Sequence, residues 1–313
     1  MAKYINNLFE WKGRVDSADN RLAFRWHQVI SNIDLMEADF DLKNTVVIIG
    51  FCCDEGVKRN KGRIGAKDAP KTIRNMLSSL PWHFDKLKIC DAGDIVVDED
   101  LEKGQALLGS LVKKIKDFGG FPVVLGGGHE VAYGTYKGIK EHSPAIINFD
   151  AHFDNRPFED TVSSGTMFAQ IAAETGSDYR YFCLGVQNYS NTKELFKRNM
   201  EFGGKFLEAS HVKMRIMDST FQSFVDKSDR LYVTVCMDVF SQAYACGVSA
   251  PNPFGICPDD FEFYAKEIFW SGKVTAFDIA EVNPAFDFDN QTSRLAAGIV
   301  FKVAEFISNW GYK

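Results

Sequence analysis

The feature that most constrains the fold of this chain is a regular alternation of two sequence patterns, which begins at Thr45. Short runs of β-branched and other apolar residues, such as TVVIIGF at 45–51, alternate with longer amphipathic stretches. Several of the short runs are apolar throughout, which is typical of parallel strands covered on both faces. The expected strands are Thr45–Phe51, Leu87–Asp91, Phe121–Leu125, Ala145–Phe149, Arg180–Leu184, Leu231–Val235 and Val274–Ile279.

The amphipathic stretches between these runs are expected to form helices. The first follows Asp68-Ala69-Pro70 and extends to about Leu80, because Asp caps a helix and Pro is tolerated in its first turn. The other expected helices are Glu102–Phe118, Glu130–Glu141, Asn191–Phe202, Pro258–Trp270 and Gln291–Trp310. The alternation predicts an α/β protein with a doubly wound sheet. Since no linker interrupts the 313 residues, we expect a single domain with residues 1–40 packed on its outside.

The composition argues against several classes of function. The net charge is −6 and no basic run is present, which disfavours binding to nucleic acids or anionic membranes. No apolar run reaches the roughly 18 residues of a membrane span, and the N-terminus has no apolar signal-peptide core. The seven cysteines are scattered without a C-x-x-C pair, as in proteins of a reducing compartment. We therefore expect a cytoplasmic protein without nucleic-acid or membrane partners.

Chemically active residues follow four of the expected strands, at the edge of the sheet where open α/β folds bind ligands. His129 follows FPVVL within GGGHE, and DAHFD (150–154) follows AIINF. Cys236 and Asp238 follow LYVTV, and Glu281 follows VTAFDI. Each motif alone is a weak signal, but their shared placement at strand ends predicts a common site.

The DAHFD segment is the most specific of these motifs. In an extended backbone the side chains at i, i+2 and i+4 point to one side, so Asp150, His152 and Asp154 could face one point. Carboxylates and imidazoles suit divalent ions such as Mn²⁺. His129, from the neighbouring strand end, would add a second imidazole, and Asp238 would add a third carboxylate. Such a set can hold two metal ions, which would activate a water molecule and polarise an electrophile.

The glycine run at 126–128 has an alternative interpretation as a phosphate-binding turn. It lacks the lysine and the spacing of a P-loop, and no acidic ribose-binding residue follows it at the right distance. The sequence therefore disfavours a metal-free nucleotide-binding protein.

These motifs, in this order, resemble those of the arginase–agmatinase (ureohydrolase) superfamily. The resemblance runs from about Thr45 to the C-terminus and includes NKGRIGAKDAP at 60–70, which is similar to a substrate-side loop of that family. It implies a three-layer α/β/α sandwich around a mostly parallel sheet, a centre with two Mn²⁺ ions, and a homo-oligomer. The activity that it implies is hydrolysis of C–N bonds in guanidino or formimidoyl groups of a small molecule.

The resemblance also implies a role for each site residue. The metal ligands would be His129, Asp150 and Asp154 for one ion, and Asp150, His152 and Asp238 for the other. Glu281 would bind the cationic nitrogen of the substrate, because an amidinium needs an anionic planar acceptor. Asp154 would accept a proton from water and pass it to the leaving nitrogen.

Within the superfamily, the sequence is most similar to the formimidoylglutamases. Arg156 stands where arginases have Asn, and a guanidinium can bind a substrate carboxylate with two hydrogen bonds. Phe168, in SSGTMF at 163–168, stands where arginases have a histidine. The segments 185–192 and 247–251 add to the similarity. The resemblance implies hydrolysis of N-formimidoyl-L-glutamate to L-glutamate and formamide in histidine degradation.

Cys236 departs from the family pattern, because it replaces the first Asp of a D-x-D motif. A thiolate is softer than a carboxylate and offers one ligating atom. The centre could hold one Mn²⁺ tightly and a second weakly, prefer a softer ion such as Zn²⁺, or use a bridging thiolate. Cys236 could equally be a small buried side chain beside a one-metal site. Other functions left open are those of a guanidino-acid hydrolase, an agmatinase, or a catalytically silent arginase-like binding subunit.

Overall fold

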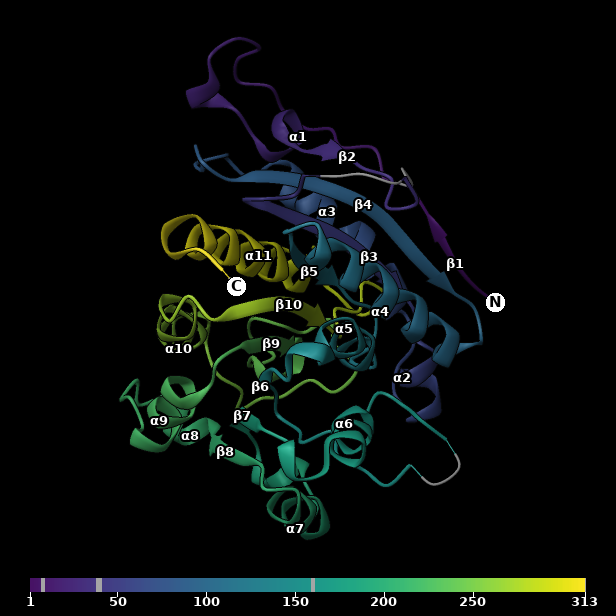
Figure 1. Cartoon of the computed structure of the whole chain (residues 1–313), viewed down its shortest axis with the longest axis vertical. Coiled ribbons are helices and arrows are strands. Elements are labelled where there is room, and N and C mark those ends of the chain that lie inside the picture. The colour runs from purple at the N-terminus through teal and green to yellow at the C-terminus, as the bar shows by residue number, and fades with distance from the viewer. Residues whose placement is uncertain (7–8, 38–40, 159–160, 313) are drawn as a thin grey trace.

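The computed structural model describes residues 1–6, 9–37, 41–158 and 161–312. The strands in these residues are β1 (Ala2–Ile5), β2 (Ser31–Asn32), β3 (Thr45–Cys52), β4 (Lys88–Val97), β5 (Phe121–Leu125), β6 (Ala145–Phe149), β7 (Tyr181–Val186), β8 (Lys205–Glu208), β9 (Leu231–Cys236) and β10 (Val274–Ala280). In this described part they form one sheet in the order β1-β4-β3-β5-β10-β9-β6-β7-β8, and β2 also pairs with β4 (Figure 1). The β1–β4 pair is antiparallel and the other pairs are parallel.

Helices cover both faces of this sheet. They are α1 (Trp26–Val29), α2 (Glu55–Arg59), α3 (Ala69–Ser78), α4 (Leu101–Asp117), α5 (Val131–Ile139), α6 (Met167–Thr175), α7 (Lys193–Glu201), α8 (Ala209–Val212), α9 (Ser219–Lys227), α10 (Pro258–Trp270) and α11 (Gln291–Trp310). Along β3, Val46 and Ile48 pack into one apolar cluster with α3, α9, α10 and α11. The alternate residues Val47 and Ile49 pack into a second cluster with α4, α5 and α6. The expected three-layer α/β/α sandwich is therefore confirmed.

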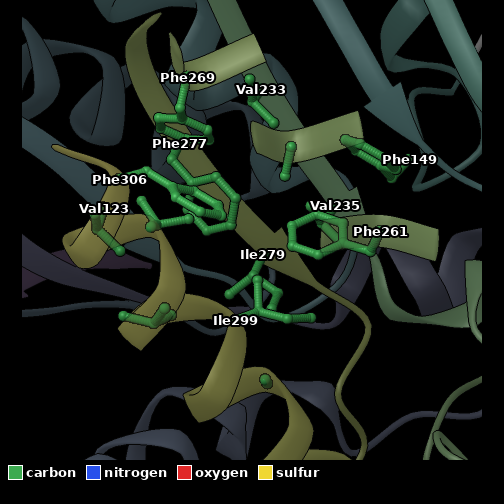
Figure 2. Close-up of a cluster of buried hydrophobic side chains, with 14 of the residues drawn as sticks. Val123, Phe149, Val233, Val235, Phe261, Phe269, Phe277, Ile279, Ile299 and Phe306 are labelled. Atoms are coloured by element: carbon green, nitrogen blue, oxygen red, sulfur yellow. The ribbon is translucent and has the colours of Figure 1, made fainter. Parts of the chain in front are cut away.

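The central strands are anchored by α10 and α11. Phe277 of β10 and Val235 of β9 belong to one buried cluster with Phe269 of α10 and Phe306 of α11 (Figure 2). The ring centroids of Phe269 and Phe306 lie 5.5 Å apart. Burial of each such side chain contributes about 1.5–3 kcal/mol to stability. This packing holds the central strands in place, and with them the start of the loops that follow their carboxyl ends.

Four neighbouring strands end in register. Ile279 of β10 pairs with Leu125 of β5 on one side and with Val235 of β9 on the other, and Val235 pairs with Phe149 of β6. The four loops that carry the candidate site residues therefore leave the sheet from one row along its carboxyl edge.

All seven predicted strands are present, and each predicted helix is found with its ends shifted by no more than two residues. The predicted end of one strand at Asp91 is wrong, because β4 continues to Val97. Arg74 is fully buried and lies 2.8 Å from Asp91 and 2.6 Å from Asp94, so both acidic side chains are neutralised within the strand. The sequence pattern did not predict β1, β2, β8, α1, α2, α6, α8 and α9.

The N-terminal segment contacts the sheet through β4. Both β1 and β2 pair with this strand, and α1 lies at the same end of the sheet (Figure 1). Trp26 is fully buried, with its ring centroid 5.5 Å from that of Trp82. Among the residues that the structure describes, none of the helices combines the length and apolar character needed to cross a bilayer.

Candidate metal centre and substrate cavity

The loop after β5 brings His129 to the centre of the sheet edge. We expected His129 on the strand next to the DAHFD strand, and this is wrong, because β10 and β9 separate β5 from β6. The loop reaches across the end of β10: the Gly126 N–H donates to the Ile279 carbonyl (2.7 Å), and the Gly127 carbonyl accepts from the Glu281 N–H (2.8 Å). A Cβ on Gly127 would lie 1.7 Å from the Cys53 carbonyl oxygen, so only glycine fits there.

Two imidazoles face one carboxylate. His129 Nδ1 lies 3.0 Å from Asp150 Oδ2 and 3.0 Å from Asp154 Oδ2. His152 Nδ1 lies 3.5 Å from Asp150 Oδ1 and 3.2 Å from Asp238 Oδ2. Each oxygen of the fully buried Asp150 is therefore directed at a different histidine.

These side chains form two groups that could each hold a metal ion. His129, Asp150 and Cys236 form one, and Asp150, His152 and Asp238 form the other; within each, the ligand atoms lie within 4.8 Å of one another. Asp238 Oδ1 is buried and has no hydrogen-bond partner among the described residues, so Asp238 has an oxygen that could still bind a cation. The donor chemistry fits divalent ions, with carboxylates and imidazoles for Mn²⁺ and one softer sulfur at Cys236.

A hydrogen-bonded relay behind His129 fixes its tautomer. His129 Nε2 lies 3.0 Å from the Thr234 hydroxyl, which itself donates to Asp278 Oδ1 (2.5 Å). The Thr234 oxygen therefore accepts from His129 Nε2–H, so that in the neutral imidazole the lone pair lies on Nδ1, the atom that faces Asp150 and Asp154. Tyr232 also donates to Asp278. Sequence reasoning missed this relay, although Thr234 and Asp278 are polar residues inside otherwise apolar strands.

The buried acidic groups of this site favour positive charge next to them. Burial and the charge of Asp150 raise the pKa of Asp154 to about 6. Burial, followed by the charge of Asp150, raises the pKa of the Cys236 thiol well above its usual range. Burial would lower the pKa of His129, but its contacts with Asp150 and Asp154 raise it well above the ordinary value. Positive charge is thus strongly favoured at this point.

Glu281 is aimed at the same space by a constrained backbone. Its φ is +67° and that of Asp154 is +46°, both in the left-handed region that L side chains rarely adopt. The Glu281 Oε1 accepts from the His129 backbone N–H (2.9 Å), whereas Oε2 is buried without a partner among the described residues. Burial, and next the charge of Glu130, raises the pKa of Glu281 well above its usual range. A cationic group on a bound molecule would relieve this unfavourable burial.

A cavity of about 280 Å³ opens over these groups. Its lining residues are Asn60, Lys61, Gly62, His129, His152, Asp154, Arg156, Ser164, Leu195, Cys236, Asp238, Ser249, Ala250 and Glu281. The structure thus brings seven of the eight predicted site residues to one cavity, and the eighth, Asp150, lies beneath it in contact with both histidines. Acidic groups occupy the buried floor, while the exposed side chains of Arg156 and Lys61 supply positive charge at the rim. Lys61 and Ser249 lie in the segments 60–70 and 247–251 that carry the family resemblance, but neither was predicted individually as a site residue.

Comparisons with known proteins show the family of this chain. Residues 44–305 match the family model described as the arginase family. The chain is similar to a formimidoylglutamase of Clostridium tetani, with 46% identity over 95% of this chain and 94% of that protein. The structure is similar to that of formimidoylglutamase from Bacillus subtilis, with a TM-score of 0.83, 26% identity, and coverage of 95% of this chain and 96% of that one. It is also similar to a formiminoglutamase variant from Trypanosoma cruzi solved with Mn²⁺, with a TM-score of 0.75, 26% identity, and coverage of 84% of this chain and 93% of that one.

Proposed function

Because this chain belongs to the arginase family, we propose that it hydrolyses N-formimidoyl-L-glutamate to L-glutamate and formamide. The observation that carries the proposal is the separation of charge in one cavity. Asp154, Asp238 and Glu281 lie at its floor, and Arg156 lies at its rim. A substrate with a cationic amidine at one end and carboxylate at the other matches this polarity.

The two ends of the substrate would have different partners. The planar amidinium would meet Glu281 Oε2, the buried oxygen that lacks a partner in the described residues. A substrate carboxylate would meet the Arg156 guanidinium, which can donate two parallel hydrogen bonds. Agmatine is a poor match, because it is cationic and has no carboxylate. A guanidino acid shares the required polarity and is the second candidate substrate class.

The metal ligands in this proposal are the two groups that share Asp150. We propose that they hold Mn²⁺, because a similar formiminoglutamase from Trypanosoma cruzi was solved with this ion. When bound, divalent ions of this kind lower the pKa of water and polarise an electrophile by Lewis acidity. Asp154 lines the cavity beside them, and its carboxylate can take a proton from the attacking water and deliver it to the departing nitrogen. Water adds to the formimidoyl carbon, the C–N bond to the glutamate nitrogen breaks, and formamide leaves.

The biological setting is part of the same proposal. We place the activity in histidine degradation and in the cytoplasm, and we expect a homo-oligomer that acts on a small molecule. The support for this setting is the family resemblance and the scattered cysteines, which all lack a disulfide partner in the described residues.

The test is a substrate comparison with purified protein loaded with Mn²⁺ under reducing conditions. We expect glutamate and formamide from N-formimidoyl-L-glutamate, and no release in a chelated sample. Urea released from a guanidino acid, with no reaction of the formimidoyl substrate, would assign the protein to another activity of the family. A protein that binds Mn²⁺ but is silent on every substrate would support the binding-subunit alternative instead.

A further inference from the structure

We propose that Lys61 is a second substrate-binding cation of this cavity, and that the site selects amidines with two carboxylates, one for Arg156 and one for Lys61. This inference rests on the proposed function and specifies its substrate class. Its basis is the position of Lys61 at the cavity rim, its unusual backbone, and its lack of a partner in the described residues.

The backbone of Lys61 has a conformation in which glycine is the usual residue. α2 ends with two hydrogen bonds: the Lys61 N–H donates to the Lys58 carbonyl (3.0 Å), and the Gly62 N–H donates to the Val57 carbonyl (2.8 Å). This is the pattern of a helix end closed by a left-handed residue, and Lys61 is that residue, with φ +61°. Glycine adopts this conformation without a steric cost, whereas lysine does not. Ending the helix therefore does not account for a lysine here, and strained non-glycine residues of this kind cluster at functional sites.

The segment that carries Lys61 is held from both sides of the cavity mouth. On one side, the Arg63 N–H donates to the Ser249 hydroxyl (2.9 Å), and Arg63 Nε donates to the Ser249 carbonyl (2.9 Å). On the other side, the Ser164 N–H donates to the Gly56 carbonyl (3.1 Å). The position of the Lys61 backbone is thus fixed relative to the cavity, as a binding residue requires.

Lys61 differs from the other cations of its segment. Lys58 and Arg59 form ion pairs with Glu55, at 3.3 and 3.1 Å, and Arg59 also pairs with Glu102. Lys61 has no ion pair or side-chain hydrogen bond within the described ranges, and the same holds for the guanidinium of Arg156. Among the residues that line the cavity, these two supply the Lys and Arg side chains. Two unpaired cations at one rim are suited to two anionic groups of one ligand.

Lys61 and Arg156 line the same cavity, and the residue before Lys61 lies near the Arg156 side chain. A Cβ added to Gly165 would lie 3.1 Å from both Asn60 Oδ1 and Arg156 Cδ. Asn60 precedes Lys61, so Gly165 is the point at which the end of α2 meets the Arg156 side chain. The carboxylates of N-formimidoyl-L-glutamate are separated by a short flexible chain and can reach two neighbouring cations while the amidine reaches the floor. An amidine with one carboxylate would leave one of the two cations unmatched.

The experiment compares Lys61→Gly with the wild type on three substrates. These are N-formimidoyl-L-glutamate and the two analogues in which either its side-chain or its α-carboxylate is replaced by an amide. We expect Lys61→Gly to lower kcat/KM for the diacid by about 10- to 100-fold, mainly through KM, which is the worth of a hydrogen bond to a charged group. Lys61→Gly should leave kcat/KM unchanged for the amide that lacks the carboxylate bound by Lys61. Arg156→Ala should leave kcat/KM unchanged for the other amide, which lacks the carboxylate bound by Arg156.

Two controls separate binding from structure. Lys61→Gly relieves the left-handed backbone, so its melting temperature should equal or exceed that of the wild type. Lys58→Ala removes the same charge three residues earlier, outside the cavity lining, and should leave the kinetics on all three substrates unchanged. A loss of activity in Lys58→Ala equal to that in Lys61→Gly would mean that general electrostatics is responsible and would overturn the proposal.

The outcomes also separate this inference from the proposed function. If the wild type hydrolyses the diacid and Lys61→Gly does so equally well, the role of Lys61 is refuted and the proposed function stands. An equal loss on all three substrates would also refute it, because the lysine would then order the loop without recognising a carboxylate. If the wild type hydrolyses no formimidoyl substrate, the proposed function fails and the role of Lys61 fails with it.

Discussion

Replacing Asp150 with Asn removes the carboxylate that both candidate metal groups share in the described part of the chain. Asn has almost the same shape and retains an oxygen, so the hydrogen bond that Asp150 Oδ1 accepts from the His152 N–H (2.8 Å) can persist. The fold should therefore survive while the charge that faces both histidines is lost. We expect binding of Mn²⁺ to weaken at both sites, whereas Asp238→Asn should weaken one site and spare the other.

The expected loss of Mn²⁺ affinity depends on how many of the two candidate metal-binding groups contain the substituted residue. Changing even an outer partner of a metal ligand typically costs about 10- to 100-fold in affinity, or about 1.4 to 2.7 kcal/mol. Loss of a direct charged ligand should cost at least this much at each site where it serves. Asp238 serves in one group and Asp150 in two, so the total cost for Asp150→Asn should be at least about 2.8 to 5.4 kcal/mol.

The assay is calorimetric titration of metal-free protein with Mn²⁺, supported by elemental analysis after dialysis. Asp178→Asn, a change at an exposed acidic residue away from the cluster, is the matched control and should bind like the wild type. The reasoning would be refuted if Asp150→Asn kept one site of wild-type affinity, because Asp150 would then belong to a single group.

Arg156→Ala should raise KM for N-formimidoyl-L-glutamate by about 10- to 100-fold with unchanged Mn²⁺ content, and an unchanged KM would contradict its role. Protein loaded with Co²⁺ should show thiolate-to-metal charge-transfer absorption that disappears in Cys236→Ser; the same spectrum in both proteins would exclude Cys236 as a ligand. Arg74→Met leaves Asp91 and Asp94 buried without their cation and should lower the free energy of unfolding by about 3–5 kcal/mol, measured by urea denaturation. A urea midpoint equal to that of the wild type would refute the importance of this ion cluster.

Much of the fold was predictable because the central strands are buried on both faces. Runs such as FPVVL and AIINF are continuous apolar segments, and the acidic or imidazole residues directly after them stand out by contrast. The same contrast predicted the site, because parallel strands deliver their carboxyl ends to one edge. The register of Leu125, Ile279, Val235 and Phe149 shows how these ends are aligned.

The features that could not be predicted depend on contacts between residues distant in sequence. β4 continues through two acidic residues because Arg74, on another element, neutralises them. β8 is a short edge strand with charged residues at both ends and little burial, so it lacks the apolar run of a central strand. His129 reaches the cluster because its glycine loop crosses a strand that comes much later in the chain. Strand order across a sheet is not encoded in any local pattern.

In the proposed complex the floor of this cavity holds metal ions and its rim holds the carboxylates of the substrate. The most direct measurement is anomalous diffraction from crystals grown with Mn²⁺ and the product L-glutamate. We expect one anomalous peak beside His129 and Cys236, a second beside His152 and Asp238, and glutamate with its carboxylates at Arg156 and Lys61. Peaks elsewhere, or glutamate bound with its carboxylates towards Glu281, would contradict this expectation.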